Sequence, residues 1–241
     1  MKLEINGFPV EAQYDEGTVQ GIFMPFLRQM GRLQRARRGR LIVFLAAPPA
    51  TGKSTLAAFL QQLAGEMEDL PPVQALGMDG FHYPQAYIRT HTVVRGGKEI
   101  PMARVKGAPD TFDTALLRQK LAAVSAGDAN WPFYDRRLHD VVPDAVAVTA
   151  PILLVEGNYL LLDDPAWRGM EHNYSVFIRA EEESLRERLI ERKVRGGLDR
   201  AAAEAFYEEC DGPNVRLCLS HSLPADMTLR MLGDGRFIQE D

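Results

Sequence analysis

The sequence of 241 residues predicts a doubly wound α/β fold, in which helices cover both faces of a central parallel sheet of about five strands. Two patterns support this prediction. Short, continuous apolar runs recur along the chain, and stretches with apolar residues at helical spacing lie between them. Continuous rather than alternating apolar runs are typical of strands that are buried on both faces, as they are in a parallel sheet between two layers of helices.

The predicted strands and helices follow one another along most of the chain. The apolar runs occupy residues 41–47, 73–78, 152–156, 174–180 and 225–232. The helical stretches occupy residues 53–65, 113–126, 181–195 and 199–210. Asp113 and Gly127 are suited to begin and end the second of these helices, and Asp199 is suited to begin the last. Gly212 and Pro213 are typical of a helix end, so we expect the last helix to stop before them.

The N-terminal part of the chain shows a different pattern. Residues 2–14 alternate between apolar and polar types around Asn6 and Gly7, a dipeptide that is typical of a tight β-hairpin turn. Residues 16–35 then carry apolar side chains at helical spacing and predict an amphipathic helix. With no internal repeat and no linker, we expect a single domain over residues 1–241. Within it, residues 1–38 are expected to form the hairpin and the helix, and residues 39–241 the core. We interpret the hairpin as a peripheral addition to the core.

The composition is typical of a globular protein in a reducing compartment. The formal net charge of -5 provides no overall basic surface for a nucleic acid, and no apolar run reaches the roughly 20 residues needed to cross a bilayer. The first residues lack the basic and then apolar plan of a signal peptide. The two cysteines, Cys210 and Cys218, cannot form a disulfide framework. We therefore expect a cytoplasmic protein without a nucleic-acid or membrane partner.

Residues 47–55 form the most specific motif, since they match the Walker A pattern G-x-x-x-x-G-K-[ST] except that Ala47 replaces the first glycine. They lie where a predicted strand gives way to a predicted helix, the place at which backbone N–H groups and the helix dipole bind phosphate. Lys53 would reach the β- and γ-phosphates of ATP, and the Ser54 hydroxyl would ligate Mg²⁺. The residues expected to bind the nucleotide are Pro48, Pro49, Ala50, Thr51, Gly52, Lys53, Ser54 and Thr55.

Two carboxylates follow predicted strands and are therefore expected at the edge of the sheet where ligands bind. Glu156 ends the strand 152–156 and is expected to hold Mg²⁺ directly or through a water; the alternative is that it caps the next turn. Asp79 follows the strand 73–78, where it could orient or deprotonate the hydroxyl that accepts a phosphoryl group. The alternative is a structural turn formed by Asp79 and Gly80.

Missing motifs narrow the class of P-loop protein. A GTPase would carry a guanine-reading N/T-K-x-D motif and a D-x-x-G switch, and the sequence contains neither. Mechanical ATPases usually have a much longer chain. These observations favour a kinase that transfers the γ-phosphate of ATP to a hydroxyl of a small metabolite. The alternative is a P-loop protein that binds ATP as a regulatory or assembly ATPase.

Three further segments carry motifs of a known kinase group. Residues 79–84 are similar to the D-G-F-x-Y-P motif of type I pantothenate kinases, and residues 106–113 are similar to their K-G-x-P-[DE]-[ST]-[YF]-D motif. Residues 132–135, followed by His139, match the P-x-Y-D-x-x-x-H motif of uridine kinases. Residues 40–232 therefore resemble P-loop kinases of the uridine kinase, pantothenate kinase and phosphoribulokinase group. The whole chain resembles the bacterial YggC-type nucleoside or nucleotide kinases, also described as fructose-transport-type kinases.

The resemblance implies roles on the acceptor side of the site. Asp79 matches the proposed catalytic base of the pantothenate kinases, and Tyr134 and His139 would face the acceptor. Two departures weaken a nucleoside acceptor: Arg136 replaces an aromatic residue of uridine kinases, and Gly107 replaces the acid that binds ribose hydroxyls. Arg136 would suit an acceptor with a carboxylate or phosphate, although an exposed loop charge is the alternative. The sequence is compatible with a pantothenate-, sugar- or nucleoside-like acceptor. It is also compatible with a homodimer.

The resemblance also implies a lid near residues 185–197. Arg188, Arg192 and Arg195 lie on one face of the predicted helix, and Arg188 or Arg192 would reach the γ-phosphate. The alternative is a solvated basic face paired with neighbouring acids. Residues 85–106 contain five basic residues and a single acid, so this insert could close over an anionic substrate or form a mobile, solvated loop.

Overall fold

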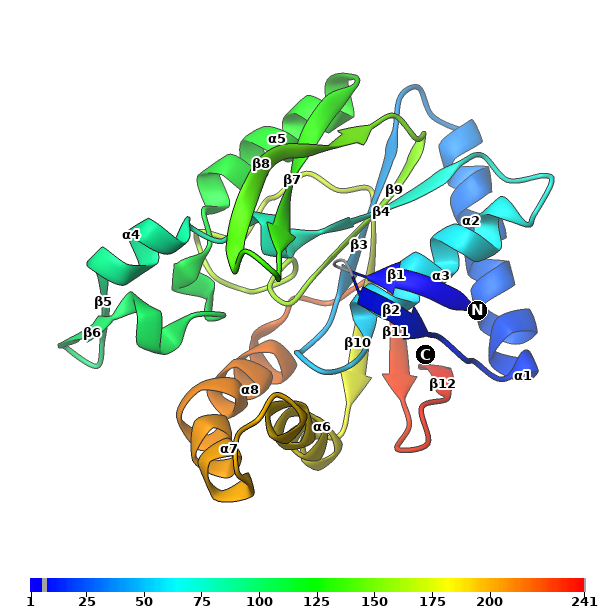
Figure 1. The fold of residues 1–241 in the computed structure, drawn as a ribbon. Helices are drawn as coiled ribbons and strands as arrows, with labels where there is room; N and C mark the ends of the chain where they lie inside the picture. Colours follow the sequence, from blue (N-terminus) through cyan, green and yellow to red (C-terminus); the bar gives the residue numbers. More distant parts are fainter. Residues whose placement is uncertain (6–7, 241) are drawn as a thin grey trace.

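The computed structural model describes residues 1–5 and 8–240, with a six-stranded sheet at the centre (Figure 1). The strands are β3 (Leu41–Ala46), β4 (Val73–Gly77), β9 (Ile152–Gly157), β10 (Tyr174–Ala180), β11 (Met227–Met231) and β12 (Phe237–Glu240). Their order across the sheet is β12-β11-β10-β3-β9-β4, and only β12 pairs in the antiparallel direction. The predicted α/β fold and its five parallel strands are confirmed. The sixth strand is an addition that the sequence did not predict.

Strand register brings three predicted site segments to one edge of the sheet. Strand β3 lies between β9 and β10, and Ala46 at its end pairs with Gly157 of β9. Strand β4 pairs with the other side of β9, where Gly77 lies opposite Glu156. Because these strands are parallel, the loops that follow all three leave the sheet at the same edge. The Walker A loop, Glu156 and the segment after β4 are therefore neighbours.

Helices cover both faces of the sheet. They are α1 (Glu16–Thr18), α2 (Met24–Arg35), α3 (Lys53–Gly65), α5 (Thr114–Ala126), α6 (Glu182–Arg195), α7 (Arg200–Phe206) and α8 (Gly212–His221), with a π-helical turn at Val19–Phe23 between α1 and α2. One apolar core lies between the sheet and α2 and α3, and a second lies under α5 on the opposite face. The predicted helix over residues 16–35 is confirmed. Helices α6, α7 and α8 form a lobe at the bottom of Figure 1.

The predicted end of the last helix is wrong. A π-helical turn, Tyr207–Asp211, joins α7 to α8, so the chain is helical from Arg200 to His221. Within this turn the Gly212 N–H donates to the carbonyl of Tyr207, five residues earlier. Pro213 then stands in the first turn of α8, where its missing N–H donor is tolerated. The predicted start is confirmed, because the Asp199 carboxylate accepts from the Ala202 N–H at 2.9 Å.

The N-terminal hairpin packs on the core. Strand β1 (Lys2–Ile5) pairs antiparallel with β2 (Phe8–Glu11), as predicted, while the Asn6–Gly7 turn lies outside the described residues. Leu3 and Ala12 are buried in the core that contains α3, and the N-terminal ammonium of Met1 donates to the Ala12 carbonyl at 2.8 Å. In Figure 1 the hairpin lies in front of the N-terminal half of α3.

Two further hairpins extend from the core. Residues 85–106, which we call the arm, contain α4 (Gln85–Thr90), β5 (Thr92–Arg95) and β6 (Lys98–Pro101), so this insert is folded rather than irregular. Gly96 and Gly97, with φ of 56° and 74°, form its turn. Strand β7 (Ala129–Asp135) pairs with β8 (Asp140–Val148) beside the arm (Figure 1). Over the part of the chain that is described, no helix is long and apolar enough to cross a membrane.

Candidate active site

The Walker A loop connects the end of β3 to the first turn of α3. Gly52 has a φ of 79°, the left-handed conformation that favours glycine, and α3 begins with Lys53. Inside the loop, the buried Thr51 hydroxyl donates to the Pro48 carbonyl at 3.0 Å. Ala47 replaces the first glycine of the motif without strain, since its φ is not positive and its side chain is fully buried. Because α3 begins at Lys53, the N–H groups of its first turn have no acceptor within the helix and are suited to bind an anion.

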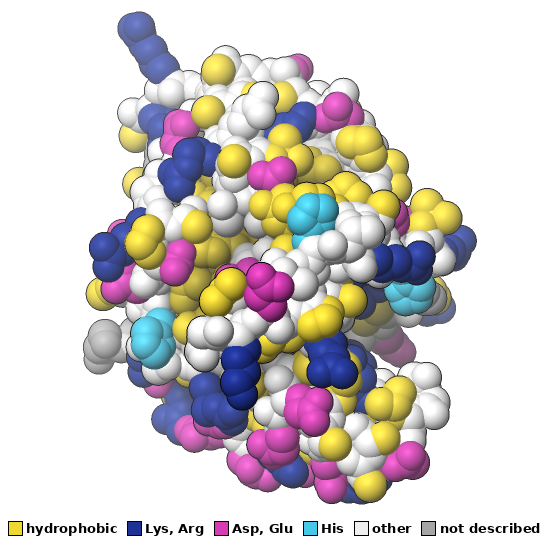
Figure 2. All heavy atoms as spheres, turned by 90° about the vertical axis from the view of Figure 1, so that its left-hand side faces the viewer, with side chains coloured by type: hydrophobic (Ala, Val, Ile, Leu, Met, Phe, Trp, Pro, Cys, Tyr) yellow, Lys and Arg dark blue, Asp and Glu magenta, His cyan; other side chains and the backbone are white. Residues whose placement is uncertain are grey.

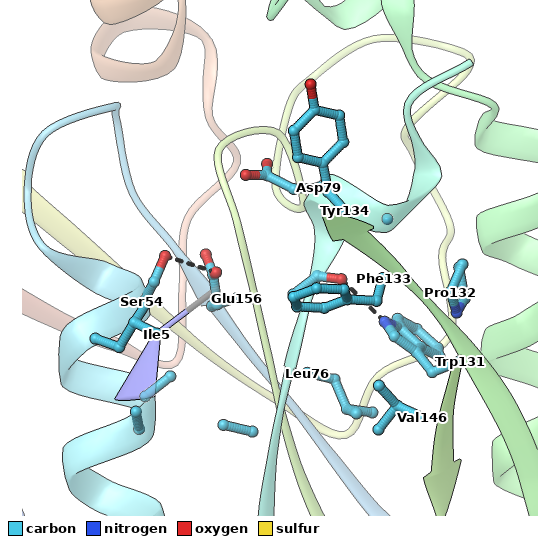
Figure 3. A pocket seen from close by; sticks show the side chains of 15 residues that line it. Ile5, Ser54, Leu76, Asp79, Trp131, Pro132, Phe133, Tyr134, Val146 and Glu156 are labelled. Atoms are coloured by element: carbon cyan, nitrogen blue, oxygen red, sulfur yellow. Dashed lines mark hydrogen bonds between the residues drawn. The ribbon is translucent and has the colours of Figure 1, made fainter. Parts of the chain in front are cut away.

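Glu156 and Ser54 meet beside this loop. The Ser54 hydroxyl donates to Glu156 Oε1 at 2.7 Å, as the dashed line in Figure 3 shows. Burial raises the pKa of the Glu156 carboxyl, and the nearby Lys53 ammonium opposes this effect. A hydroxyl and a carboxylate are oxygen ligands that suit Mg²⁺. Among the described residues no group of three or more His, Cys, Asp or Glu side chains could hold a metal, so phosphate oxygens and waters would have to complete the set.

Asp79 lies in a short 3-10 helix, Met78–Phe81, that directly follows β4. Its Oδ2 is 3.6 Å from the Arg136 guanidinium, which follows β7. The close approach of the two segments depends on Gly80, because a Cβ at this position would lie 2.3 Å from the Pro132 carbonyl oxygen. Asp79, which is predicted to act on the acceptor hydroxyl, is thus paired with Arg136, which is predicted to bind a negatively charged group of the acceptor.

Tyr134 is fixed by a contact with the arm. The Lys106 ammonium donates to the Tyr134 hydroxyl at 2.8 Å and to Gln85 Oε1 at 2.6 Å. The neighbouring His82 ring stacks on Phe112 with centroids 3.8 Å apart, and its burial lowers its pKa. Lys106 therefore joins the arm to β7 at the border of the site.

The lid arginines approach the Walker A loop from α6. Arg188 Nη1 lies 3.5 Å from the Ala50 carbonyl oxygen, which ties this helix to the loop. Asp211 and Asn158 each carry a buried side-chain oxygen that has no hydrogen-bond partner among the residues that the structure describes. Burial raises the pKa of Asp211, and the Lys193 ammonium lowers it in part.

One cavity of about 750 Å³ collects most of these groups. Of the residues predicted from the sequence, its wall contains Pro49, Ala50, Gly52, Lys53, Ser54, Thr55, Asp79, Tyr134, Arg136, Arg188, Arg192 and Arg195. Pro48 and Thr51, also in the loop, are buried. Glu156 lines a smaller adjoining chamber of about 200 Å³ (Figure 3). The structure does not bring His139 to either wall, because this residue is exposed in the turn between β7 and β8 with a φ of 53°.

The cavity wall also contains residues that sequence reasoning did not assign to the site, namely Val10, His82, Lys106, Phe112, Asn158, Lys193 and Phe206, and it contains Gly107, Asp211 and Asn214 as well. Lys106 lies within the 106–113 motif and could have been identified from it. No pattern in the sequence indicates Val10. In Figure 2, Lys and Arg side chains gather in the lower half of the face shown, at the height of helices α6–α8 in Figure 1.

Fold and site together define the class of this protein as a P-loop kinase. A structure from Silicibacter sp., described as that of a candidate fructose transport system kinase, superposes with a TM-score of 0.74 at 29% identity, covering 86% of this chain and 98% of that chain. A candidate uridine kinase of Schizosaccharomyces pombe is 29% identical over 80% of this chain and 84% of its own length. No family model matches the chain.

The uncharacterized protein YggC of Escherichia coli is 44% identical over 240 residues, which is 98% of each chain. The chain therefore belongs to the same family as YggC. This result confirms the resemblance of the whole chain to the YggC family.

Proposed function

We propose that this protein is a Mg-ATP-dependent kinase that phosphorylates a hydroxyl of a small metabolite carrying a negatively charged group. The observation that supports this proposal is the shared cavity, whose wall contains the Walker A loop and the lid arginines together with Asp79, Tyr134 and Arg136. A volume of about 750 Å³ is in the range of sites that hold small molecules and cofactors.

On the nucleotide side, the loop N–H groups and Lys53 bind the β- and γ-phosphates. Ser54 and Glu156 hold Mg²⁺, which, when bound, neutralises charge on the phosphate oxygens. Arg188 and Arg192 extend from α6 into the same cavity and stabilise the charge of the phosphoryl group in transfer. Because Arg188 already contacts the loop carbonyl of Ala50, only a small movement of the lid would be needed for it to reach the phosphoryl group.

On the acceptor side, Asp79 orients the hydroxyl and takes its proton as the new P–O bond forms and the bond to ADP breaks. Arg136 and Lys106 lie on the same border and favour an acceptor with a carboxylate or phosphate. Tyr134, held by Lys106, offers a hydroxyl to the acceptor. We assign no acceptor contact to His139, because it lies in an exposed turn.

A screen for acceptor-dependent ADP release tests the proposal. Pantothenate, glycerate, nucleosides and ketohexoses are each supplied with Mg-ATP, and the Lys53→Ala variant is the blank. We expect ADP release to require an acceptor and to favour those with a negative group. ATP that is bound or hydrolysed at the same rate with and without every acceptor would instead support the regulatory or assembly ATPase. A preference for neutral nucleosides would contradict the role of Arg136.

A further inference from the structure

The N-terminal hairpin reaches both cavities of the site, although the sequence indicated only a decoration. Ile5, at the end of β1, lines the 200 Å³ chamber together with Ser54 and Glu156, and Figure 3 shows it beside Ser54. Val10, in β2, lines the 750 Å³ cavity that contains Lys53. Both side chains are half-buried. One hairpin therefore supplies an apolar side chain to the wall of each cavity.

Most of the residues that line the chamber beside Ile5 are apolar. Its walls come from α3, β4, β7 and β8 and include Ala57, Leu76, Phe133 and Val146. Four polar side chains also line it, those of Ser54, Asp79, Tyr134 and Glu156. An apolar chamber of this size admits an uncharged group but not a charged one, which would lose its hydration there.

The hairpin is anchored well enough to serve as a fixed wall. Leu3 and Ala12 belong to the main core, and the Met1 ammonium closes the hairpin by donating to the Ala12 carbonyl. The following residue Tyr14 packs edge-on against Phe59 of α3, with ring centroids 4.6 Å apart. The same helix carries Ser54 in its first turn. The hairpin is thus held to the element that positions the phosphate-binding groups.

We propose that the N-terminal hairpin is a wall of the phosphotransfer site, in which Ile5 and Val10 exclude water and Ile5 sets the room for an uncharged part of the acceptor. This inference rests on the proposed kinase function. Water is the competing acceptor in every kinase: its oxygen attacks the γ-phosphorus, the bond to ADP breaks, and its proton is lost to Asp79 or solvent. Apolar side chains beside the reacting groups keep that water out.

The test begins with Mg-ATP alone, so it does not depend on knowing the acceptor. Ile5→Ala and Val10→Ala should release ADP and phosphate faster than the wild type, because each opens a path for water. Ile5→Trp should lower this hydrolysis below the wild-type rate, because it fills the chamber. With the best acceptor from the screen, Ile5→Ala and Ile5→Trp should each lower kcat/KM by about tenfold, the effect of a changed apolar pocket.

Lys2→Ala and Glu11→Ala are the matched controls, since these residues pair across the same hairpin and are exposed outside both cavities. Melting temperatures identify any variant that loses its fold, and Ile5→Val then replaces Ile5→Ala. The inference is overturned if the Ile5 and Val10 variants match the controls in both assays while turnover still depends on Lys53. Turnover that does not depend on Lys53 would overturn the proposed function itself.

Discussion

The Ser54 hydroxyl donates to Glu156 Oε1 at 2.7 Å and so joins the first turn of α3 to the end of β9, across 102 residues of sequence. The carboxylate is buried, and its charge is opposed by burial and favoured by the Lys53 ammonium. The bond holds together the two oxygen atoms that we propose as ligands of Mg²⁺. Burial of the charged carboxylate also destabilises the folded protein, because a buried carboxylate is less stable than a solvated one.

The first prediction concerns Glu156→Gln and the pH dependence of stability. Since burial raises the folded-state pKa of Glu156, the folded protein binds more protons than the unfolded chain above the ordinary glutamate pKa of about 4.3. This residue therefore destabilises the fold increasingly as pH rises through that window. Without metal or nucleotide, we expect the variant to melt above the wild type at about pH 8, with the difference shrinking towards about pH 4.5. A pH-independent difference in melting temperature would contradict this account.

The second prediction concerns Lys53→Ala. Lys53 is the first residue of α3 and lines the cavity. Loss of its ammonium should therefore remove the positive charge beside the β- and γ-phosphates. We expect kcat to fall by about 10²–10³, the effect of removing one stabilising group in other active sites. Lys98→Ala, on the exposed arm hairpin, is the control and should retain full turnover. Near-normal turnover of the Lys53 variant would refute the P-loop assignment.

The third prediction concerns Asp79→Asn, which keeps the shape of the side chain but loses its charge and basicity. We expect kcat to fall at least about 100-fold, with ATP affinity changed only a few-fold. Steady-state kinetics and nucleotide titration measure the two effects separately. A purely structural Asp79 would show the reverse, a destabilised protein whose folded fraction turns over normally. Loss of ATP binding only in the presence of Mg²⁺ would make Asp79 a metal-binding residue.

The fourth prediction concerns the lid. Arg188→Ala and Arg192→Ala should lower kcat far more than they lower the melting temperature, because both side chains line the cavity. Arg200→Ala, in the adjacent helix α7, is the control, since its ion pairs with Glu187 and Glu204 are exposed. Such surface pairs contribute only about 0–1 kcal/mol. If the melting temperature falls while kcat holds, the two lid arginines are structural.

The fifth prediction concerns Arg136→Gln. A charge-assisted hydrogen bond contributes about 1.5–3 kcal/mol, so its loss should raise KM for a negatively charged acceptor by about 10- to 100-fold. Acceptors without a negative group should keep their KM. Arg89→Gln, an exposed arginine of the arm outside the cavity wall, is the control. An equal change for charged and neutral acceptors would assign Arg136 to positioning Asp79, which it contacts at 3.6 Å.

Local sequence patterns determined the elements that follow short-range rules. The continuous apolar runs located β3, β9 and β10, which are buried along almost their whole length, whereas β4 and β11 were also located although each includes half-buried positions. The Walker A loop was located by the spacing of Gly52, Lys53 and Ser54 between a strand and a helix. The predicted end of the helix that begins at Arg200 was wrong, because the π-helical turn before Pro213 removes the clash that a proline normally causes within a helix.

Only the tertiary structure decided which of these elements meet. The same runs of strand and helix are compatible with several strand orders, and it is the position of β3 between β9 and β10 that brings Ser54 to Glu156. The contact of Asp79 with Arg136 depends on how the β7–β8 hairpin packs on Gly80, and the placement of Ile5 depends on how β1 packs on α3. Such contacts join residues far apart in sequence and depend on shape complementarity across the whole core, which no local pattern records.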